Sequence, residues 1–167
     1  MKPITVDMPY PSIKDLKKDV KSAYIIAPSY TGLKSEITAI LQYVYHAHFF
    51  AACGEEKTAE TLEQIAMAEM KHLEVLGETI LTLGVKPVYA INDGFNYNYY
   101  NTSMIKCGTS PKIMLLEDIE GELNAIATYE EQIKKLCNDD VKAIIARIKL
   151  DEELHVLVLK GILSDYS

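Results

Sequence analysis

The chain has 167 residues, 49% of them hydrophobic, and a net charge of −7, which together fit one domain with a sizeable core. The negative charge and the scattered lysines argue against nucleic-acid binding, which needs clustered Lys and Arg. The first 30 residues contain no secretory signal pattern, and no segment has the roughly 20 apolar residues of a membrane span. We therefore predict a cytoplasmic protein with neither a nucleic-acid nor a membrane partner.

Residues 1–30 have the composition of an N-terminal arm. Prolines at positions 3, 9, 11 and 28 interrupt any long helix in this segment. We predict one short helix at most, around Ile13 to Ile26, and we place the main domain at residues 31–167.

Helical periodicity dominates the rest of the chain. Apolar residues recur at helical spacing from Thr31 to Cys53, and after Gly54 the same spacing resumes until Gly84 and Pro87 end it. This pattern predicts two long helices joined by a tight turn.

A second pair of helices follows a segment without a clear period. Residues 85–110, rich in Gly, Asn and Tyr, form the predicted crossover, and the tyrosines at 97, 99 and 100 suggest a segment packed on the helices or at an interface. One helix then runs from Pro111 to about Cys137, and the last runs from about Val141 to Leu163. The three cysteines form no C-x-x-C pair, which excludes a zinc-ribbon module and fits reduced structural thiols.

The two helical pairs repeat each other. The segment SEITAILQY (35–43) aligns with GELNAIATY (121–129), and both second helices carry Glu-x-x-His. The repeated residues are Glu36, Tyr43, Glu69 and His72 in the first half, and Glu122, Tyr129, Glu152 and His155 in the second. We expect two antiparallel helical hairpins, with the second and third helices parallel and the crossover spanning the length of the bundle.

Helix geometry places these polar groups inside the bundle at one level. Glu36 lies 18 residues before Gly54 and His72 lies 18 residues after it, so antiparallel pairing brings them together. Four buried carboxylates without compensation would cost several kcal/mol each, and no Lys or Arg falls on these helix faces at that level. Two divalent metal ions would satisfy four carboxylates and two imidazoles, the ligand set of dinuclear iron and manganese carboxylate bundles. His46 and His48 are turned away from Glu36, so we interpret them as interhelical or surface histidines. Asp118 fits either a residue that supports a ligand or a first-turn acid, and we favour the first-turn acid.

These motifs resemble the ferritin-like family, in its rubrerythrin and manganese-catalase branch. The resemblance covers roughly residues 31–163, and it implies an all-α, ferritin-like four-helix bundle with one long crossover. It also implies that Tyr43 and Tyr129 hydrogen-bond to ligands on neighbouring helices. Two features depart from rubrerythrins: Ala125 stands where they carry an additional glutamate, and a rubredoxin domain is missing. The ligands implied for two iron or two manganese ions are Glu36, Glu69, His72, Glu122, Glu152 and His155.

The predicted function is that of an oxidoreductase, peroxidase-like or catalase-like, acting on hydrogen peroxide or dioxygen. We assign catalytic roles to Glu69 and Glu152, as the carboxylates that bridge the metals, and to Tyr43 and Tyr129. Two alternatives remain open: iron oxidation and storage, or an assembly bundle in which metals are structural staples. We also predict a homodimer or a higher homo-oligomer.

Overall fold

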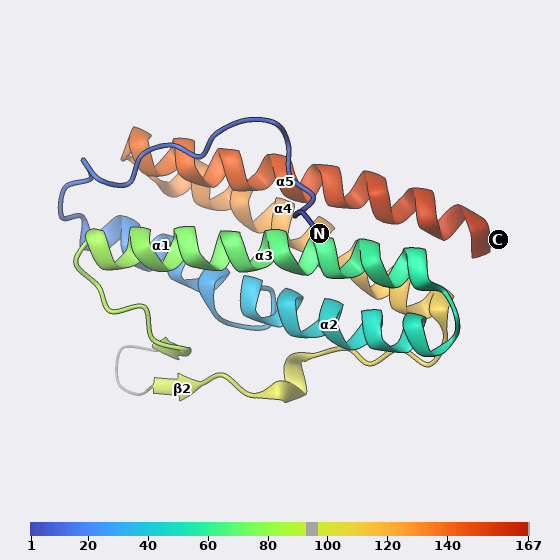
Figure 1. The fold of residues 1–167 in the computed structure, drawn as a ribbon. Coiled ribbons are helices and arrows are strands. Elements are labelled where there is room, and N and C mark those ends of the chain that lie inside the picture. The colour runs from blue at the N-terminus through green and yellow to red at the C-terminus, as the bar shows by residue number, and fades with distance from the viewer. Residues whose placement is uncertain (93–96, 167) are drawn as a thin grey trace.

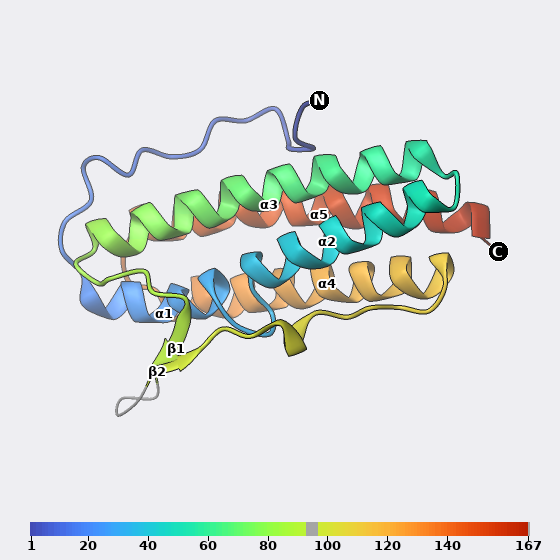
Figure 2. The ribbon, with the colours of Figure 1, turned by 60° about the horizontal axis from the view of Figure 1, so that its bottom comes forward.

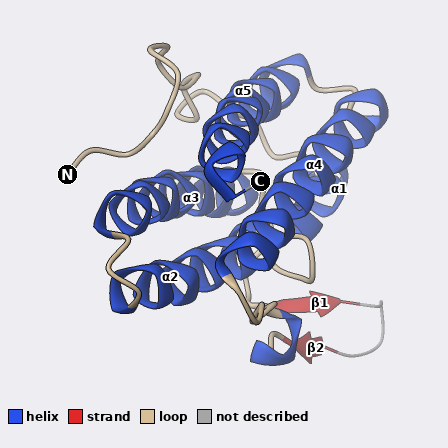
Figure 3. Cartoon of the chain, turned by 90° about the vertical axis from the view of Figure 1, so that its right-hand side faces the viewer, coloured by secondary structure: helices blue, strands red, loops and turns tan. Residues whose placement is uncertain are grey.

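The computed structural model describes residues 1–92 and 97–166, and its main body is a bundle of long helices (Figure 1). Helices α2 (Glu36–Ala52) and α3 (Glu56–Thr82) form the first hairpin, and α4 (Pro111–Lys135) and α5 (Asp139–Leu163) form the second. Helices α3 and α4 run parallel, as the repeat predicted, and the end-on view shows the four helices around a common interior (Figures 2 and 3). The predicted all-α bundle of two helical hairpins joined by one long crossover is therefore confirmed.

The helix ends follow from local sequence chemistry. Ser110 caps α4, with Pro111 in the first turn, and Asn138 caps α5 by accepting hydrogen bonds from two backbone N–H groups. Gly54 (φ 80°) makes the turn between α2 and α3, and Gly84 (φ 98°) follows the end of α3. Both glycines adopt positive φ angles that other residues rarely reach, so they set the length of α3.

The N-terminal segment contains helix α1 (Val20–Tyr30), which begins later than the predicted Ile13. Asp19 caps it by accepting from the backbone N–H of Ser22, and that cap fixes the start. Residues 1–19 run back from α1 along the outside of α3 and α5, on the side of the bundle opposite the crossover (Figure 2). The boundary at residue 30 stays a prediction, although α1 packs on α3 and shares its core.

The crossover contains short elements that the sequence did not reveal. Strands β1 (Ala90–Asn92) and β2 (Tyr97–Tyr99) pair antiparallel, and a 3-10 turn, η1, covers Thr102–Met104. The segment then continues along the bundle to the start of α4, as predicted (Figure 2). Tyr100 accepts a hydrogen bond from Thr38 of α2 at 3.3 Å, whereas the other two tyrosines of the predicted set are exposed.

Two apolar clusters fill the bundle, one towards each end. The first, which we call the α1-end core, includes Ile26, Leu76, Ile80 and Ile144. The second, the turn-end core, includes Phe50, Leu62, Met114 and Leu159. The predicted polar residues occupy the middle of the bundle. Within the described part of the chain, no helix has the length and apolar character needed to cross a membrane.

Candidate metal centre

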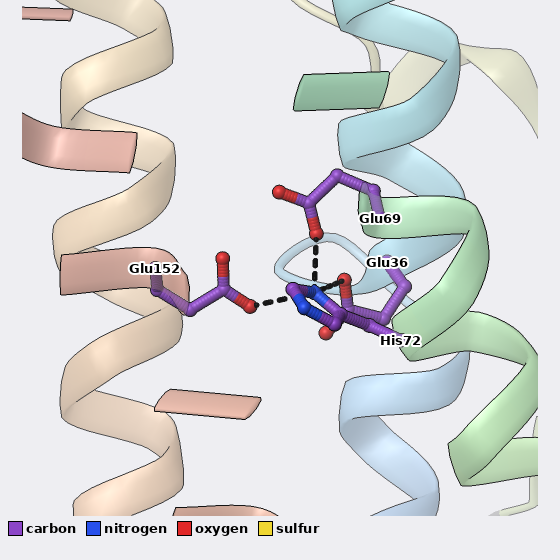
Figure 4. A group of neighbouring side chains, drawn as sticks. All are labelled: Glu36, Glu69, His72 and Glu152. Atoms are coloured by element: carbon purple, nitrogen blue, oxygen red, sulfur yellow. Dashed lines mark hydrogen bonds and ion pairs between the residues drawn. The ribbon is translucent and has the colours of Figure 1, made fainter. Parts of the chain in front are cut away.

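Six buried polar side chains meet at mid-bundle, and they are the six predicted ligands. Each is at most 4% exposed. The i, i+3 spacing puts the Glu and His of α3 on one inward face, and the same spacing acts in α5. The six form two overlapping groups whose potential ligand atoms lie within 4.8 Å of one another: Glu36, Glu69, His72 and Glu152 (Figure 4), and Glu69, Glu122, Glu152 and His155.

Glu69 and Glu152 belong to both groups, and each directs one oxygen to each histidine. Glu69 Oε2 lies 3.0 Å from His72 Nδ1, while its Oε1 lies 3.0 Å from His155 Nδ1. Glu152 Oε1 lies 3.2 Å from His72 Nδ1, and Glu152 Oε2 lies 3.1 Å from His155 Nδ1. These two carboxylates therefore have the geometry of bridging ligands between two positions.

Glu36 and Glu122 each face only one position. Glu36 Oε2 lies 3.6 Å from His72 Nδ1, and Glu122 Oε1 lies 3.6 Å from His155 Nδ1. Each of these carboxylates also accepts a hydrogen bond from a tyrosine of the opposite half: Tyr129 donates to Glu36 and Tyr43 to Glu122. This exchange is what the family resemblance implied, and it shows that the twofold repeat extends to the contacts around the ligands.

The outer nitrogen of each imidazole, Nε2, has a hydrogen-bond partner, and this partner determines whether the inner nitrogen, Nδ1, carries a proton. His155 Nε2 lies 2.8 Å from the backbone carbonyl oxygen of Ile4, a group that only accepts, so Nε2 carries the proton. His72 Nε2 lies 3.1 Å from the Asp151 carboxylate. In the neutral form, each Nδ1 then presents a lone pair to the surrounding carboxylates, which is the arrangement of a metal-ligating histidine.

The donors around this centre are too few for its acceptors. Glu69 Oε1 and Glu152 Oε1 are buried and accept no hydrogen bond from the described residues. Such orphaned buried oxygens are rare unless an ion or water satisfies them. Carboxylates and imidazoles together suit iron and manganese, so the residues present fit two metal ions.

The electrostatics of the metal-free protein reflect the same crowding. Burial, followed by repulsion from Glu69 and Glu152, raises the pKa of Glu36 and of Glu122 well above the ordinary range. Burial alone would lower the pKa of His72, but the Glu152 and Glu69 carboxylates outweigh burial and raise it well above its usual value. Protons would therefore compete with any metal ion for these side chains.

Sequence reasoning missed Asp151, which holds the outer nitrogen of His72. This fully buried carboxylate also accepts from the backbone N–H of Val6 at 2.7 Å and from the Tyr10 hydroxyl at 2.6 Å. Its ion pair with Arg147 measures 2.8 Å. Burial tends to raise the pKa of Asp151, but its partners His72, Tyr10, Val6 and Arg147 bring it down to about 2. Asp151 directly precedes Glu152, a candidate ligand, and this adjacency was the available signal.

The interpretation of Asp118 as a first-turn acid is wrong. Helix α4 begins at Pro111, so Asp118 lies two turns inside it, where it is buried. His46 Nδ1 lies 2.8 Å from Asp118 Oδ1, and the Gln42 amide donates to the same oxygen at 2.9 Å. His46 is thus a buried interhelical residue, paired with Asp118 away from the two ligand groups. The three cysteines are free and exposed.

A cavity connects the centre to the surface between α2 and α4. Its volume is about 210 Å³, and the carboxylates of Glu36, Glu69, Glu122 and Glu152 line it. Lys106 and Glu120, which form an exposed ion pair at 2.6 Å, also line this cavity. A small molecule could therefore reach the ligands from the crossover side of the bundle.

The family model of the ferritin-like domain matches residues 31–159, most of the chain. The chain belongs to the ferritin-like family. Its relatives include a bacterioferritin of Streptomyces coelicolor, 32% identical over 127 residues, which cover 74% of this chain and 70% of the relative. A bacterioferritin of Rhodobacter capsulatus is 30% identical over 139 residues, covering 81% of this chain and 80% of that protein.

Solved structures agree with this ferritin-like assignment. A manganese catalase from Anabaena, KatB, superposes with a TM-score of 0.83 over 96% of this chain and 78% of its own, at 21% identity. The R. capsulatus bacterioferritin, solved with a metal-free dinuclear site, gives a TM-score of 0.74 at 27% identity, covering 90% and 88% of the two chains. The predicted ferritin-like resemblance is thereby confirmed.

Proposed function

We propose that this ferritin-like protein binds two iron or two manganese ions at mid-bundle and acts as an oxidoreductase on hydrogen peroxide or dioxygen. The observation that carries the proposal is the pair of shared carboxylates. Glu69 and Glu152 each direct one oxygen to each histidine, so two positions have common ligands. Two adjacent redox metals, when bound, supply a two-electron couple and Lewis acidity toward an oxygen substrate.

The chain's own residues have separable roles in this proposal. Glu69 and Glu152 would serve both metal positions, while Glu36 with His72 and Glu122 with His155 would complete them. Tyr43 and Tyr129 orient the unshared carboxylates through their hydroxyl protons. The apolar clusters on both sides exclude bulk water, and the cavity offers a small molecule access to the carboxylates.

Iron oxidation and storage is the second candidate function, and the two bacterioferritin relatives favour it. A purely structural role is the third candidate. Metals that served only as staples would need no access, whereas the cavity of about 210 Å³ reaches the ligand carboxylates, so it supports chemistry on a small molecule.

Metal analysis and turnover distinguish the three functions. Protein reconstituted without oxygen should retain close to two Fe²⁺ or Mn²⁺ ions per chain, and the loaded protein should consume hydrogen peroxide catalytically. Accumulation of many iron atoms per chain in air would favour storage, and two ions without turnover of either oxidant would favour a structural role. Absence of stoichiometric binding would remove the dinuclear proposal.

We also propose a homodimer or higher homo-oligomer. Helix α4 exposes Ile113, Leu116 and Leu123, each more than 40% accessible, and an exposed apolar stripe of this kind fits a subunit contact. Sedimentation equilibrium gives the mass directly, and a monomer at all concentrations would contradict the proposal.

A further inference from the structure

The two halves of the centre differ in how the outer histidine nitrogen is held. Asp151, the residue before Glu152, lies 3.1 Å from His72 Nε2. The internal repeat pairs Glu152 with Glu69, so the position equivalent to Asp151 is Ala68. An alanine side chain accepts no hydrogen bond, and the repeat therefore leaves His155 without the partner that His72 has.

The N-terminal arm supplies the missing acceptor. The carbonyl oxygen of Ile4 lies 2.8 Å from His155 Nε2. Ile4 is held in place because its N–H donates to the backbone carbonyl of Gln64 at 3.2 Å, one turn before Ala68 on α3. The Ile4 side chain also packs on the turn-end core. A backbone group of the arm thus occupies the role that Asp151 has in the other half.

The same arm also secures Asp151. The N–H of Val6 and the hydroxyl of Tyr10 donate to its carboxylate. Arg147 donates to the carbonyls of Met8 at 2.8 Å and Val6 at 3.0 Å, and its guanidinium lies 4.3 Å from the centre of the Tyr10 ring. The arm runs along the outside of α3 and α5, the helices that carry both histidines (Figure 2).

We propose that residues 4–10 form a positioning strap for the dinuclear centre. The Ile4 carbonyl holds the proton on Nε2 of His155, and Val6 and Tyr10 fix Asp151 against Nε2 of His72, so that both Nδ1 atoms face inward. This proposal rests on the proposed metal binding. The proposal has the consequence that the two metal positions depend unequally on Ile4. Loss of Ile4 lowers the metal affinity of the position formed by His155 and Glu122, whereas the position formed by His72 keeps its support from Asp151.

Zinc, a diamagnetic probe for carboxylate and imidazole ligands, tests this consequence. Three proteins are compared by competition with a chelator: the full-length chain, a variant lacking residues 2–5, and a control lacking residues 2–3, which retains Ile4. Loss of partners that orient a ligating histidine typically reduces metal affinity by about 10–100-fold. In the 2–5 deletion we expect a reduction of this size in the zinc affinity of one of the two positions, while the affinity of the other position stays unchanged. The control should match the full-length chain at both positions.

Proton NMR of the zinc-loaded, ¹⁵N-labelled proteins gives a readout that general destabilisation would not reproduce. In the full-length protein, the Nε2–H protons of His72 and His155 should exchange slowly with water. Deletion of residues 2–5 should abolish protection at His155 and preserve it at His72.

Two results would overturn the proposal that residues 4–10 position the two histidines. One is unchanged affinity at both zinc positions and unchanged protection in the 2–5 deletion. The other is a rapidly exchanging His155 Nε2–H in the full-length protein, a measurement that decides the matter even if the deletion does not fold. Failure of the full-length chain to bind two zinc ions would instead count against the dinuclear centre itself.

Discussion

Two ion pairs on α5 share the same i, i+4 spacing but differ in burial, and together they provide a matched test of the structure. Arg147 and Asp151 lie 2.8 Å apart, at 3% and 0% side-chain exposure. Lys149 and Glu153 lie 2.7 Å apart, at 20% and 44% exposure. The spacing along the helix is therefore the same, and the pairs differ in solvent access and in the additional partners of Asp151, which are Val6, Tyr10 and His72.

Asp151→Ala should destabilise the protein strongly, because it leaves the buried guanidinium of Arg147 without its counter-charge. Removing one partner of a buried pair costs about 3–5 kcal/mol. The Val6 N–H and the Tyr10 hydroxyl lose an acceptor as well. Glu153→Ala removes a partly exposed pair, and its cost should not exceed about 0.5 kcal/mol.

Urea unfolding of the metal-free proteins, followed by circular dichroism, measures both changes without interference from metal binding. The midpoint should fall markedly for Asp151→Ala and hardly at all for Glu153→Ala, with similar slopes. Equal losses for the two variants, or a loss below about 1 kcal/mol for Asp151→Ala, would refute the assignment of Arg147 and Asp151 as a buried, mutually dependent pair.

Three further outcomes are expected. The folded metal-free protein holds protons on Glu36 and His72, whose pKa values are raised. Its free energy of unfolding should therefore fall as pH rises above the unfolded pKa values of about 4.3 and 6.5, whereas the metal-loaded protein should gain stability over the same range. Urea titrations from pH 5 to 8 that show a rise in stability without metal would contradict this. Confirmed removal of metal by a chelator should lower the melting temperature in calorimetry, and an unchanged curve would argue against a buried centre. Glu69→Ala should abolish peroxide consumption, and the double variant with Glu152→Ala should have hardly less activity than Glu69→Ala alone. Met70→Ala, at an exposed neighbouring position, should retain activity. Peroxide turnover that survives in Glu69→Ala would favour a storage or structural function.

The meeting of the six candidate ligands was predictable because the repeat carries them in side chains at fixed helical spacing. Two Glu-x-x-His motifs, each preceded by a glutamate and a tyrosine, specify which faces point inward and at what height. Once antiparallel hairpins are assumed, helix geometry alone brings Glu36 to the level of His72. The structure places all six residues together on this basis.

The support around the ligands was not predictable in the same way. Ile4 acts through its backbone carbonyl, a group that every residue has, so no residue type marks its role. Asp118 was misread although the start of its helix at Pro111 was predicted, because the partner that explains its burial, His46, lies 72 positions away in the chain. Such contacts depend on tertiary packing rather than on local pattern. The strands of the crossover are three residues long and give no periodic signal.

The exchange of tyrosines between the hairpins makes their sequences mutually dependent. Tyr43 lies 79 positions before the carboxylate that it orients, and Tyr129 lies 93 positions after its own partner. Neither hairpin is therefore a self-sufficient module that could be transplanted or redesigned alone. A change at Tyr43 disturbs Glu122 in the opposite half, and compensation for it must be sought there. Directed evolution of this scaffold would accordingly have to vary both hairpins within the same library.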